Sequence, residues 1–198
     1  AIHLALNHKR LLLVSPTGSG KSAIIYTILR YHQELIDKDY KILLLTQNIS
    51  LVHQMYSDFN EYSKNDSKWN VELNCHKIYE GQEKICPEKQ IYISTWQSIY
   101  KLKKHYFDNF RVVIGDEAHK YQADSLQTIM KKLENCPIRI GTTGTLQDTK
   151  VHKLILQGLF GIPYRPVTTQ KLMDEKKLAF LKIECLVLEY PEEDRKLV

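Results

Sequence analysis

Residues 15–22 combine two glycines, a lysine and a serine in the order Ser-Pro-Thr-Gly-Ser-Gly-Lys-Ser. Gly18 and Gly20 allow backbone N–H groups to point at phosphate oxygens, because no Cβ obstructs a close approach. Lys21 can then reach the β- and γ-phosphates of a nucleotide, and the Ser22 hydroxyl can bind Mg²⁺. The pattern predicts a binding site for ATP and Mg²⁺, formed by Pro16, Thr17, Gly18, Ser19, Gly20, Lys21 and Ser22.

The segments on either side of this loop predict a strand before it and a helix after it. The apolar run Arg10–Val14 is typical of a buried strand, and Ala23–Leu29 is typical of a helix whose N-terminal dipole would favour phosphates. A flexible turn is the alternative for a glycine-rich stretch taken alone, and the expected strand and helix disfavour it. Ser15 occupies the position that the general motif gives to glycine, where a small residue is enough for the chain to turn.

A pair of adjacent carboxylates follows another apolar run, Arg111–Gly115. Parallel-sheet proteins bind ligands beyond the carboxyl ends of their strands, so Asp116 and Glu117 are expected at such an edge. We expect Asp116 to complete the Mg²⁺ shell and Glu117 to orient and deprotonate the attacking water. Alone, the run Asp116–His119 would fit a solvated loop equally well. Together with the phosphate loop it predicts ATP hydrolysis.

Small polar residues follow the ends of three further expected strands, in segments 46–54, 94–98 and 141–145. Hydroxyl and amide groups at strand ends and helix N-termini suit hydrogen bonds to phosphate oxygens, without reading base identity. Helix capping alone would explain any one segment, whereas the repetition favours a nucleic-acid contact. The residues expected to make this contact are Thr46, Gln47, Asn48, Ser94 and Thr95.

The composition fits a single globular domain of 198 residues with a formal net charge of +5. No apolar run reaches the roughly 20 residues of a membrane span, and the N-terminus carries no basic leader, so we expect a cytoplasmic protein with no membrane partner. The sequence does not begin with Met, which suggests a fragment. The four cysteines are scattered, which disfavours structural zinc and disulfides. The charge is compatible with a polyanionic partner without requiring one.

Apolar runs predict strands at 11–14, 42–46, 71–76, 91–94, 112–115 and 138–142. Runs that are apolar throughout, with helical patterns between them, indicate a parallel sheet covered by helices on both faces. The apolar stripe within 126–133 has the spacing of a helix face that packs on such a sheet, and Lys131 and Lys132 would lie on its solvent side. Residues 60–70 and 80–89 are rich in polar and turn-forming residues and predict loops.

Residues 100–107 interleave lysines with aromatic residues. Such a segment could contact a nucleic-acid backbone and stack on bases. A solvated helix end is the favoured interpretation, because short runs of charge usually indicate no more than that.

At these motifs the chain resembles the superfamily 2 helicases and translocases, over nearly its whole length. The corresponding segments are 15–22 (motif I), 46–54 (motif Ia), 94–98 (the contact after the fourth strand), 116–119 (motif II) and 143–145 (motif III). The resemblance implies an α/β fold, a P-loop RecA-like three-layer sandwich with a mainly parallel sheet. It also implies that His119 belongs to the catalytic set and that His119, Thr143 and Thr145 couple nucleotide to nucleic acid. Motif III departs from the family's Thr-Ala-Thr-Pro at Gly144 and Leu146.

Within the family, segments 141–146, 164–172 and 178–183 look closer to DNA-repair and restriction-type translocases than to RNA-remodelling proteins, and the overall run is similar to that of recombination helicases. This implies ATP-driven unwinding or branch migration of branched or forked DNA, or of RNA–DNA hybrids. An RNA-directed helicase and a nucleotide-gated nucleic-acid-binding module are the alternatives. Glu117 disfavours the module, because a switch needs no general base.

The family resemblance also implies a second RecA-like lobe as a partner of this one. We therefore interpret residues 1–165 as the ATP-binding lobe and 166–198 as an exit segment toward the second lobe. A short helix at 169–177 and a late strand at 181–190 are expected in that segment. An extra edge strand on the same sheet is an equally good interpretation of it.

Overall fold

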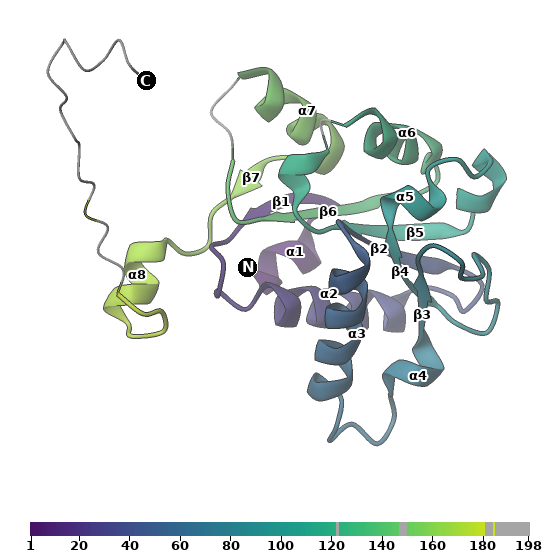
Figure 1. Cartoon of the computed structure of the whole chain (residues 1–198), viewed down its shortest axis with the longest axis horizontal. Coiled ribbons are helices and arrows are strands. Elements are labelled where there is room, and N and C mark those ends of the chain that lie inside the picture. Colours follow the sequence, from purple (N-terminus) through teal and green to yellow (C-terminus); the bar gives the residue numbers. More distant parts are fainter. Residues whose placement is uncertain (122, 147–149, 181–183, 185–198) are drawn as a thin grey trace, which may run out of the picture. The chain divides into compact units, whose positions relative to one another are not determined.

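A computed structural model of the chain describes residues 1–121, 123–146, 150–180 and 184. Within them, seven strands form one sheet in the order β3-β4-β2-β5-β6-β1-β7, and every pairing is parallel (Figure 1). The strands are β1 (Arg10–Val14), β2 (Lys41–Thr46), β3 (Cys75–Ile78), β4 (Ile91–Thr95), β5 (Phe110–Gly115), β6 (Ile138–Thr143) and β7 (Pro163–Tyr164).

Two sets of helices cover the two faces of this sheet, as Figure 1 shows. One face carries α1 (Ile2–Asn7), α2 (Lys21–Leu35), α3 (Ile49–Tyr62) and α4 (Val71–Asn74). The opposite face carries α5 (Trp96–Ile99), α6 (Asp124–Lys132), α7 (Lys150–Phe160) and the 3₁₀ turns η1 (Lys104–Phe107) and η2 (Ala118–Lys120). The expected three-layer α/β sandwich is confirmed.

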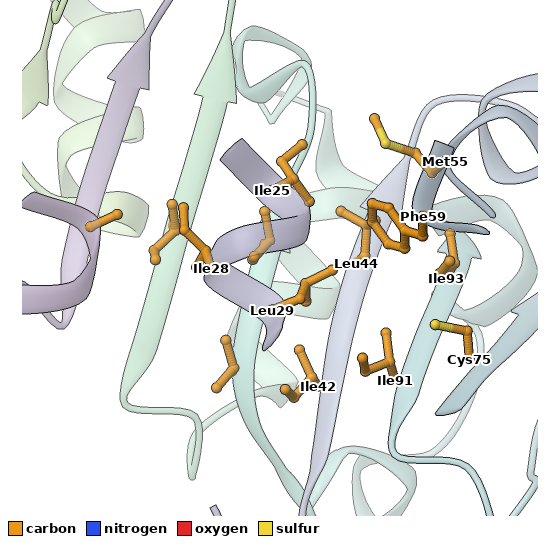
Figure 2. Close-up of a cluster of buried hydrophobic side chains, with 14 of the residues drawn as sticks. Ile25, Ile28, Leu29, Ile42, Leu44, Met55, Phe59, Cys75, Ile91 and Ile93 are labelled. Carbon is orange, nitrogen blue, oxygen red and sulfur yellow. The ribbon is translucent and has the colours of Figure 1, made fainter. Parts of the chain in front are cut away.

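Both layers of the core are apolar because successive side chains of a strand point to opposite faces of the sheet. In β2, Ile42 and Leu44 join one cluster, Leu43 and Leu45 join the other, and all four are fully buried. Figure 2 shows the first cluster, with Ile28 on the helix α2 that covers these strands. The burial of each such side chain stabilises the folded state by about 1.5–3 kcal/mol. The sheet therefore holds the loops at its edges in fixed positions.

The carboxyl ends of the parallel strands meet at one edge of the sheet, and the strand order decides which loops become neighbours. Because β6 lies between β5 and β1, the loops that contain 15–22, 116–119 and 144–146 come together. Because β4 lies beside β2, the segments 47–48 and 96–98 form a second pair farther along the same edge.

The expected strand at 71–76 is wrong in its first four residues, because residues 71–74 form α4 and the strand begins at Cys75. Asn70 Oδ1 accepts a hydrogen bond of 2.8 Å from the backbone N–H of Leu73, which caps a helical turn. The helix α3 also continues through Tyr62, into a segment expected to be a loop. The other five expected strands are present, each within two residues of its expected bounds.

The aromatic part of segment 100–107 packs on the core, while Lys101 and Lys103 are exposed. Phe107 is fully buried. Lys132, which was expected on a solvated face, donates hydrogen bonds from Nζ to the carbonyls of Tyr100 and Leu102 at 2.6 and 2.7 Å. The lysine therefore ties α6 to the end of α5, because those carbonyls need a donor. Lys131 is exposed, as expected.

The chain divides into two compact units, residues 1–168 and 169–198, and each is described by itself. The second contains α8 (Thr169–Asp174), which is shorter than the expected helix and buries Leu172. The expected strand at 181–190 lies, apart from residue 184, outside the described residues. In the part of the chain that the structure describes, no helix is long and apolar enough to cross a membrane. The interpretation of 166–198 as an exit segment stays a prediction.

Candidate active site

The loop after β1 has the backbone conformation that a phosphate-binding loop requires. Gly18 and Gly20 have φ angles of 78° and 81°, in the left-handed region that favours glycine. Gly20 is also the N-cap of α2, so the first N–H groups of that helix open toward the loop. Ser15, which replaces the general motif's glycine, shares a hydrogen bond with Ser19 across the loop (Oγ to Oγ, 2.7 Å). These contacts hold a shape that presents backbone donors to an anion.

Lys21 lies between the phosphate loop and the loop after β6. Its Nζ donates a 3.5 Å hydrogen bond to the carbonyl of Ser15. A Cβ at Gly144 would lie 3.6 Å from Lys21 Nζ and 3.5 Å from Thr17 Oγ1. The loop after β6 therefore lies against the phosphate loop, with the lysine ammonium between them. A point charge placed there can contact phosphate oxygens from the side.

Asp116 is buried at the end of β5, with 5% of its surface exposed. Burial raises the pKa of its carboxyl, and the neighbouring Glu117 charge raises this pKa further. Three interactions lower this pKa: Thr142 donates from Oγ1 to Asp116 Oδ1 at 2.8 Å, the backbone N–H of Glu117 donates to the carboxylate, and the Lys21 ammonium is near. A carboxylate that is buried and only partly compensated gains free energy by binding a cation.

The oxygen donors at this edge fit Mg²⁺ held together with a nucleotide. Mg²⁺ is usually bound by one or two carboxylates and by substrate phosphates, not by an all-protein cage. Asp116 supplies a carboxylate, and Ser22, half-buried in the first turn of α2, supplies a hydroxyl. Among the described residues, no group of three or more His, Cys, Asp or Glu side chains could hold a metal ion alone.

Glu117, His119 and Thr143 form a connected group across the loops after β5 and β6. Glu117 has φ 49° and ψ 51°, a left-handed conformation that is uncommon outside glycine and clusters at functional sites. His119 Nδ1 lies 3.2 Å from Glu117 Oε2 and 2.9 Å from Thr143 Oγ1. The Thr143 hydroxyl donates its one proton to the carbonyl of Thr145 at 2.8 Å, so the proton between His119 and Thr143 belongs to Nδ1.

Tyr121 packs against the end of β5, and its buried hydroxyl has no hydrogen-bond partner among the described residues. The ring stacks edge-on against Phe160 at 4.9 Å and leaves no room for a Cβ at Gly115. We expect Tyr121→Phe to stabilise the fold by about 1 kcal/mol, because a buried unsatisfied polar group costs about 1–3 kcal/mol. Urea unfolding measures this. A loss of stability in the variant would show that the hydroxyl has a partner.

Three of the five residues expected to contact a nucleic acid have buried side chains. Thr46 and Ser94 are 0% exposed and Thr95 is 4% exposed. Thr46 Oγ1 donates to the carbonyl of Ser94 at 3.4 Å, and Ser94 Oγ donates to the carbonyl of Thr95 at 2.9 Å. The Thr46 hydroxyl therefore links the carboxyl ends of β2 and β4, whereas the Ser94 hydroxyl bonds within β4. The polar groups that reach the surface belong to the residues that follow.

The polar groups that reach the surface at this part of the edge are Gln47 and Asn48 after β2 and Gln97 and Ser98 in α5. Asn48 and Gln97 are exposed, and Gln47 and Ser98 are half-buried. Gln97 Nε2 donates to the carbonyl of Gln47 at 3.3 Å, which joins the two segments. Asn48 Oδ1 caps α3 by accepting from the N–H of Leu51 at 2.9 Å. Together they line an open cavity of about 390 Å³. Its donors are neutral amides, hydroxyls and a helix N-terminus, which suit phosphate or sugar oxygens. The Glu80 carboxylate also lines the cavity and disfavours a phosphate directly beside it.

Two contacts to the expected site residues come from positions that the sequence analysis did not single out. Thr142 donates to Asp116. The Tyr62 hydroxyl shares a 2.8 Å hydrogen bond with Ser22 Oγ, and 40 positions separate the two in the chain. The run of hydroxyls at 141–145 is a signal from which Thr142 could have been found. Nothing in the local sequence marks Tyr62.

The chain is similar to several known proteins. Residues 2–148 match the family described as "Type III restriction enzyme, res subunit". Over 196 residues the chain is 32% identical to the ATP-dependent DNA helicase uvsW of Enterobacteria phage T4, a match that covers 98% of this chain and 38% of the relative. The crystal structure of the UvsW helicase from bacteriophage T4 is similar with a TM-score of 0.71 and 28% identity, over 84% of this chain and 57% of that chain.

The Pyrococcus furiosus Hef helicase domain shares the fold, with a TM-score of 0.68 at 19% identity over 87% of this chain and 38% of that chain. The chain spans about two fifths (38%) of the length of the phage T4 relative, the helicase uvsW. The matched range includes the glycine-rich loop at 15–22, the carboxylates at 116–117 and the segment 143–145. With a RecA-like fold and these motifs inside the match, the chain belongs to the type III restriction enzyme res subunit family of helicase-type proteins.

Proposed function

We propose that this chain is the first RecA-like lobe of an ATP-dependent DNA helicase or translocase that acts on branched or forked DNA. One observation carries the proposal: the end of β6 is hydrogen-bonded to both halves of the nucleotide site. Thr142 binds Asp116, and Thr143 binds His119 through Oγ1. The Thr143 carbonyl also accepts from the N–H of Ser15 at 2.8 Å. A change at the phosphates can therefore reach the coupling segment through direct contacts.

In the proposed site, the N–H groups of residues 17–22 and the Lys21 ammonium bind the phosphates of ATP. Asp116 and Ser22 would hold Mg²⁺, which when bound neutralises the charge that develops on the phosphates. Thr142 keeps the Asp116 carboxylate turned to the site through its 2.8 Å hydrogen bond.

Glu117 is the proposed general base, which takes a proton from the attacking water. His119 Nδ1–H contacts the Glu117 carboxylate and so restrains its orientation. The same N–H contacts Thr143, so a shift of Glu117 and a shift of the loop after β6 are linked. This is the proposed route from hydrolysis to the nucleic-acid contacts. It includes Thr145, which holds the Thr143 hydroxyl.

We propose that the polar groups after β2 and β4 bind the DNA backbone. Gln47 and Asn48 would make direct contacts, as would the exposed amide of Gln97. The buried hydroxyls of Thr46, Ser94 and Thr95 would hold these groups in place. The resemblance to recombination helicases supports branched DNA, or an RNA–DNA hybrid, as the substrate. A DNA motor of this kind would work in the cytoplasm.

The proposed arrangement includes a second RecA-like lobe. Residues 1–165 would form the lobe described here, and residues 166–198 would lead toward the second. The structural neighbours support it, because this chain covers only 57% of the UvsW helicase chain and 38% of the Hef helicase domain chain. The gap between the lobes would hold the nucleotide and the nucleic acid.

Glu117→Gln should slow ATP hydrolysis by about 10²–10⁴-fold, the usual scale for loss of a general base, and leave Mg-ATP affinity nearly unchanged. Asp116→Asn should instead lower the affinity measured in Mg²⁺, because it removes the charged ligand. Isothermal titration with a slowly hydrolysed ATP analogue and phosphate-release assays separate the two effects. Equal loss of nucleotide affinity in both variants would contradict this division of roles.

The double variant Gln47→Ala, Gln97→Ala should weaken DNA binding several-fold and to the same extent for oligonucleotides of unrelated sequence, since backbone contacts carry no base information. Gln157→Ala, at an exposed glutamine of α7, is the matched control and should bind as the wild type does. Fluorescence anisotropy at two salt concentrations measures the DNA affinity of both variants. A loss confined to one sequence would show base readout instead.

The proposed function is tested by ATP turnover of the complete polypeptide, including the proposed second lobe, with forked DNA, duplex DNA and RNA. We expect phosphate release to rise most with forked DNA. Stimulation by RNA alone would favour the RNA-directed helicase. Nucleotide-dependent DNA affinity without turnover would identify a nucleotide-gated binding module and contradict the proposal.

A further inference from the structure

The face of α2 that begins at Ser22 continues as a line of contacts with the end of α3. Ser22, Tyr26 and Arg30 are four residues apart and so share this face. The last residue of α3, Tyr62, contacts two of them. Its hydroxyl shares the 2.8 Å hydrogen bond with Ser22 Oγ, and its ring lies 5.5 Å from the Tyr26 ring. A tyrosine from a distant part of the chain therefore meets the expected Mg²⁺ ligand.

The position of Tyr62 is fixed by a packed scaffold rather than by one contact. Tyr26, its ring neighbour, also packs on the fully buried Phe59 at 5.5 Å. The Tyr26 hydroxyl accepts a hydrogen bond of 2.9 Å from Arg30 Nη1. Arg30 is held in turn by an ion pair of 2.8 Å with Asp66. Because each partner is restrained by the next, the Tyr62 hydroxyl stays beside the first turn of α2.

A serine hydroxyl that binds a divalent cation uses an oxygen lone pair for the metal and keeps its proton. That proton needs an acceptor, and it becomes a stronger donor because the cation withdraws charge from the oxygen. The phenolic oxygen of Tyr62 is such an acceptor at 2.8 Å. Tyr62 is 42% exposed, so its own O–H can turn to water without a desolvation cost.

We infer that Tyr62 is a positioning residue for the nucleotide-bound Mg²⁺, acting through Ser22. It selects the Ser22 rotamer and accepts the hydrogen bond that the serine O–H donates when the serine oxygen binds the cation. The inference rests on the proposed function, since it requires that Ser22 is a metal ligand. It assigns to α3 a second role, because this helix begins at the proposed DNA contact, Asn48, and ends at the metal ligand's partner.

The test is the Mg²⁺ dependence of nucleotide binding, measured by titration with the fluorescent analogue mant-ADP in Mg²⁺ and in EDTA. Tyr62→Phe keeps the ring and removes only the acceptor. It should weaken binding about 3- to 10-fold in Mg²⁺, the range expected for one hydrogen bond, and leave binding in EDTA unchanged. Tyr31→Phe, at a partly exposed tyrosine of α2, the helix that carries Ser22, is the matched control and should change neither value.

The outcomes separate the inference from the proposal beneath it. Wild-type binding of mant-ADP that is indifferent to Mg²⁺ would overturn both. A normal Mg²⁺ effect in the wild type, with the same affinity in Tyr62→Phe, would overturn only the role of Tyr62. Equal weakening in Mg²⁺ and EDTA would show a packing effect. Tighter binding by the variant would show that Tyr62 competes with the cation for Ser22.

Discussion

Lys21→Ala should reduce ATP hydrolysis to background and weaken triphosphate binding. The lysine ammonium lies between the phosphate loop and the loop after β6, 3.5 Å from the Ser15 carbonyl. A neutral side chain there removes the point charge that meets the β- and γ-phosphates. The fold should survive, because Lys21 is only partly buried and its hydrogen bond to Ser15 is long and weak.

The matched control for this variant is Lys131→Ala, at an exposed lysine of α6. It removes the same charge from a face with no expected ligand, so hydrolysis should be unchanged. Phosphate release and a thermal melt should be measured on both variants. Turnover near the wild-type rate in a folded Lys21→Ala variant would remove Lys21 from the site.

The chain alone should hydrolyse ATP about 10³–10⁵-fold more slowly than the same chain joined to a second RecA-like lobe, the scale of an arginine finger in related NTPases. Four of the described arginines make hydrogen bonds or ion pairs elsewhere in the fold. Arg111 and Arg139, at the amino ends of their strands, donate to the carbonyls of Asp108 and Leu133 at 2.7 and 2.6 Å. Arg30 is paired with Asp66.

Arg10 also lies at the amino end of its strand, β1, and donates to the Gly158 carbonyl. Arg165 directly follows β7. The edge with the carboxylates is opposite to Arg10, Arg111 and Arg139, so these three side chains do not face the expected γ-phosphate. Arg165 lies beyond the carboxyl end of β7, the edge strand that is three strands away from β5 and its carboxylates. Steady-state phosphate release on forked DNA, with and without the second lobe, checks the prediction. Equal DNA-stimulated rates would eliminate the two-lobe mechanism.

The sequence predicted most of the sheet because its strands are buried on both faces. A run such as Ile42–Leu45 is apolar throughout, and such runs have few other places in a globular fold. The exception, residues 71–76, is short and mixed, and the Asn70 cap decides in favour of a helical turn. The two-residue strand β7 has no periodic signal at all, and it exists only because β1 offers a free side for pairing.

In the candidate site, too, some features follow from the local sequence and others depend on contacts between residues far apart in the chain. The phosphate loop and the carboxylates could be predicted because their chemistry needs particular residues at fixed spacing. The burial of Thr46 and Ser94 could not, because it depends on β2 and β4 becoming neighbours. The contact of Tyr62 with Ser22 depends on how α3 packs across α2, which no local pattern encodes.

A crystal structure of the chain with Mg²⁺ and a non-hydrolysable ATP analogue tests the central claim most directly. We predict that the phosphates lie against residues 16–22 and that the metal ion is bound by oxygens of Ser22 and Asp116. Nucleotide density elsewhere would contradict the account, for example in the cavity at the amino ends of β2 and β5, which is lined by Lys41 and Phe110. A metal ion bound without Asp116 would contradict it equally.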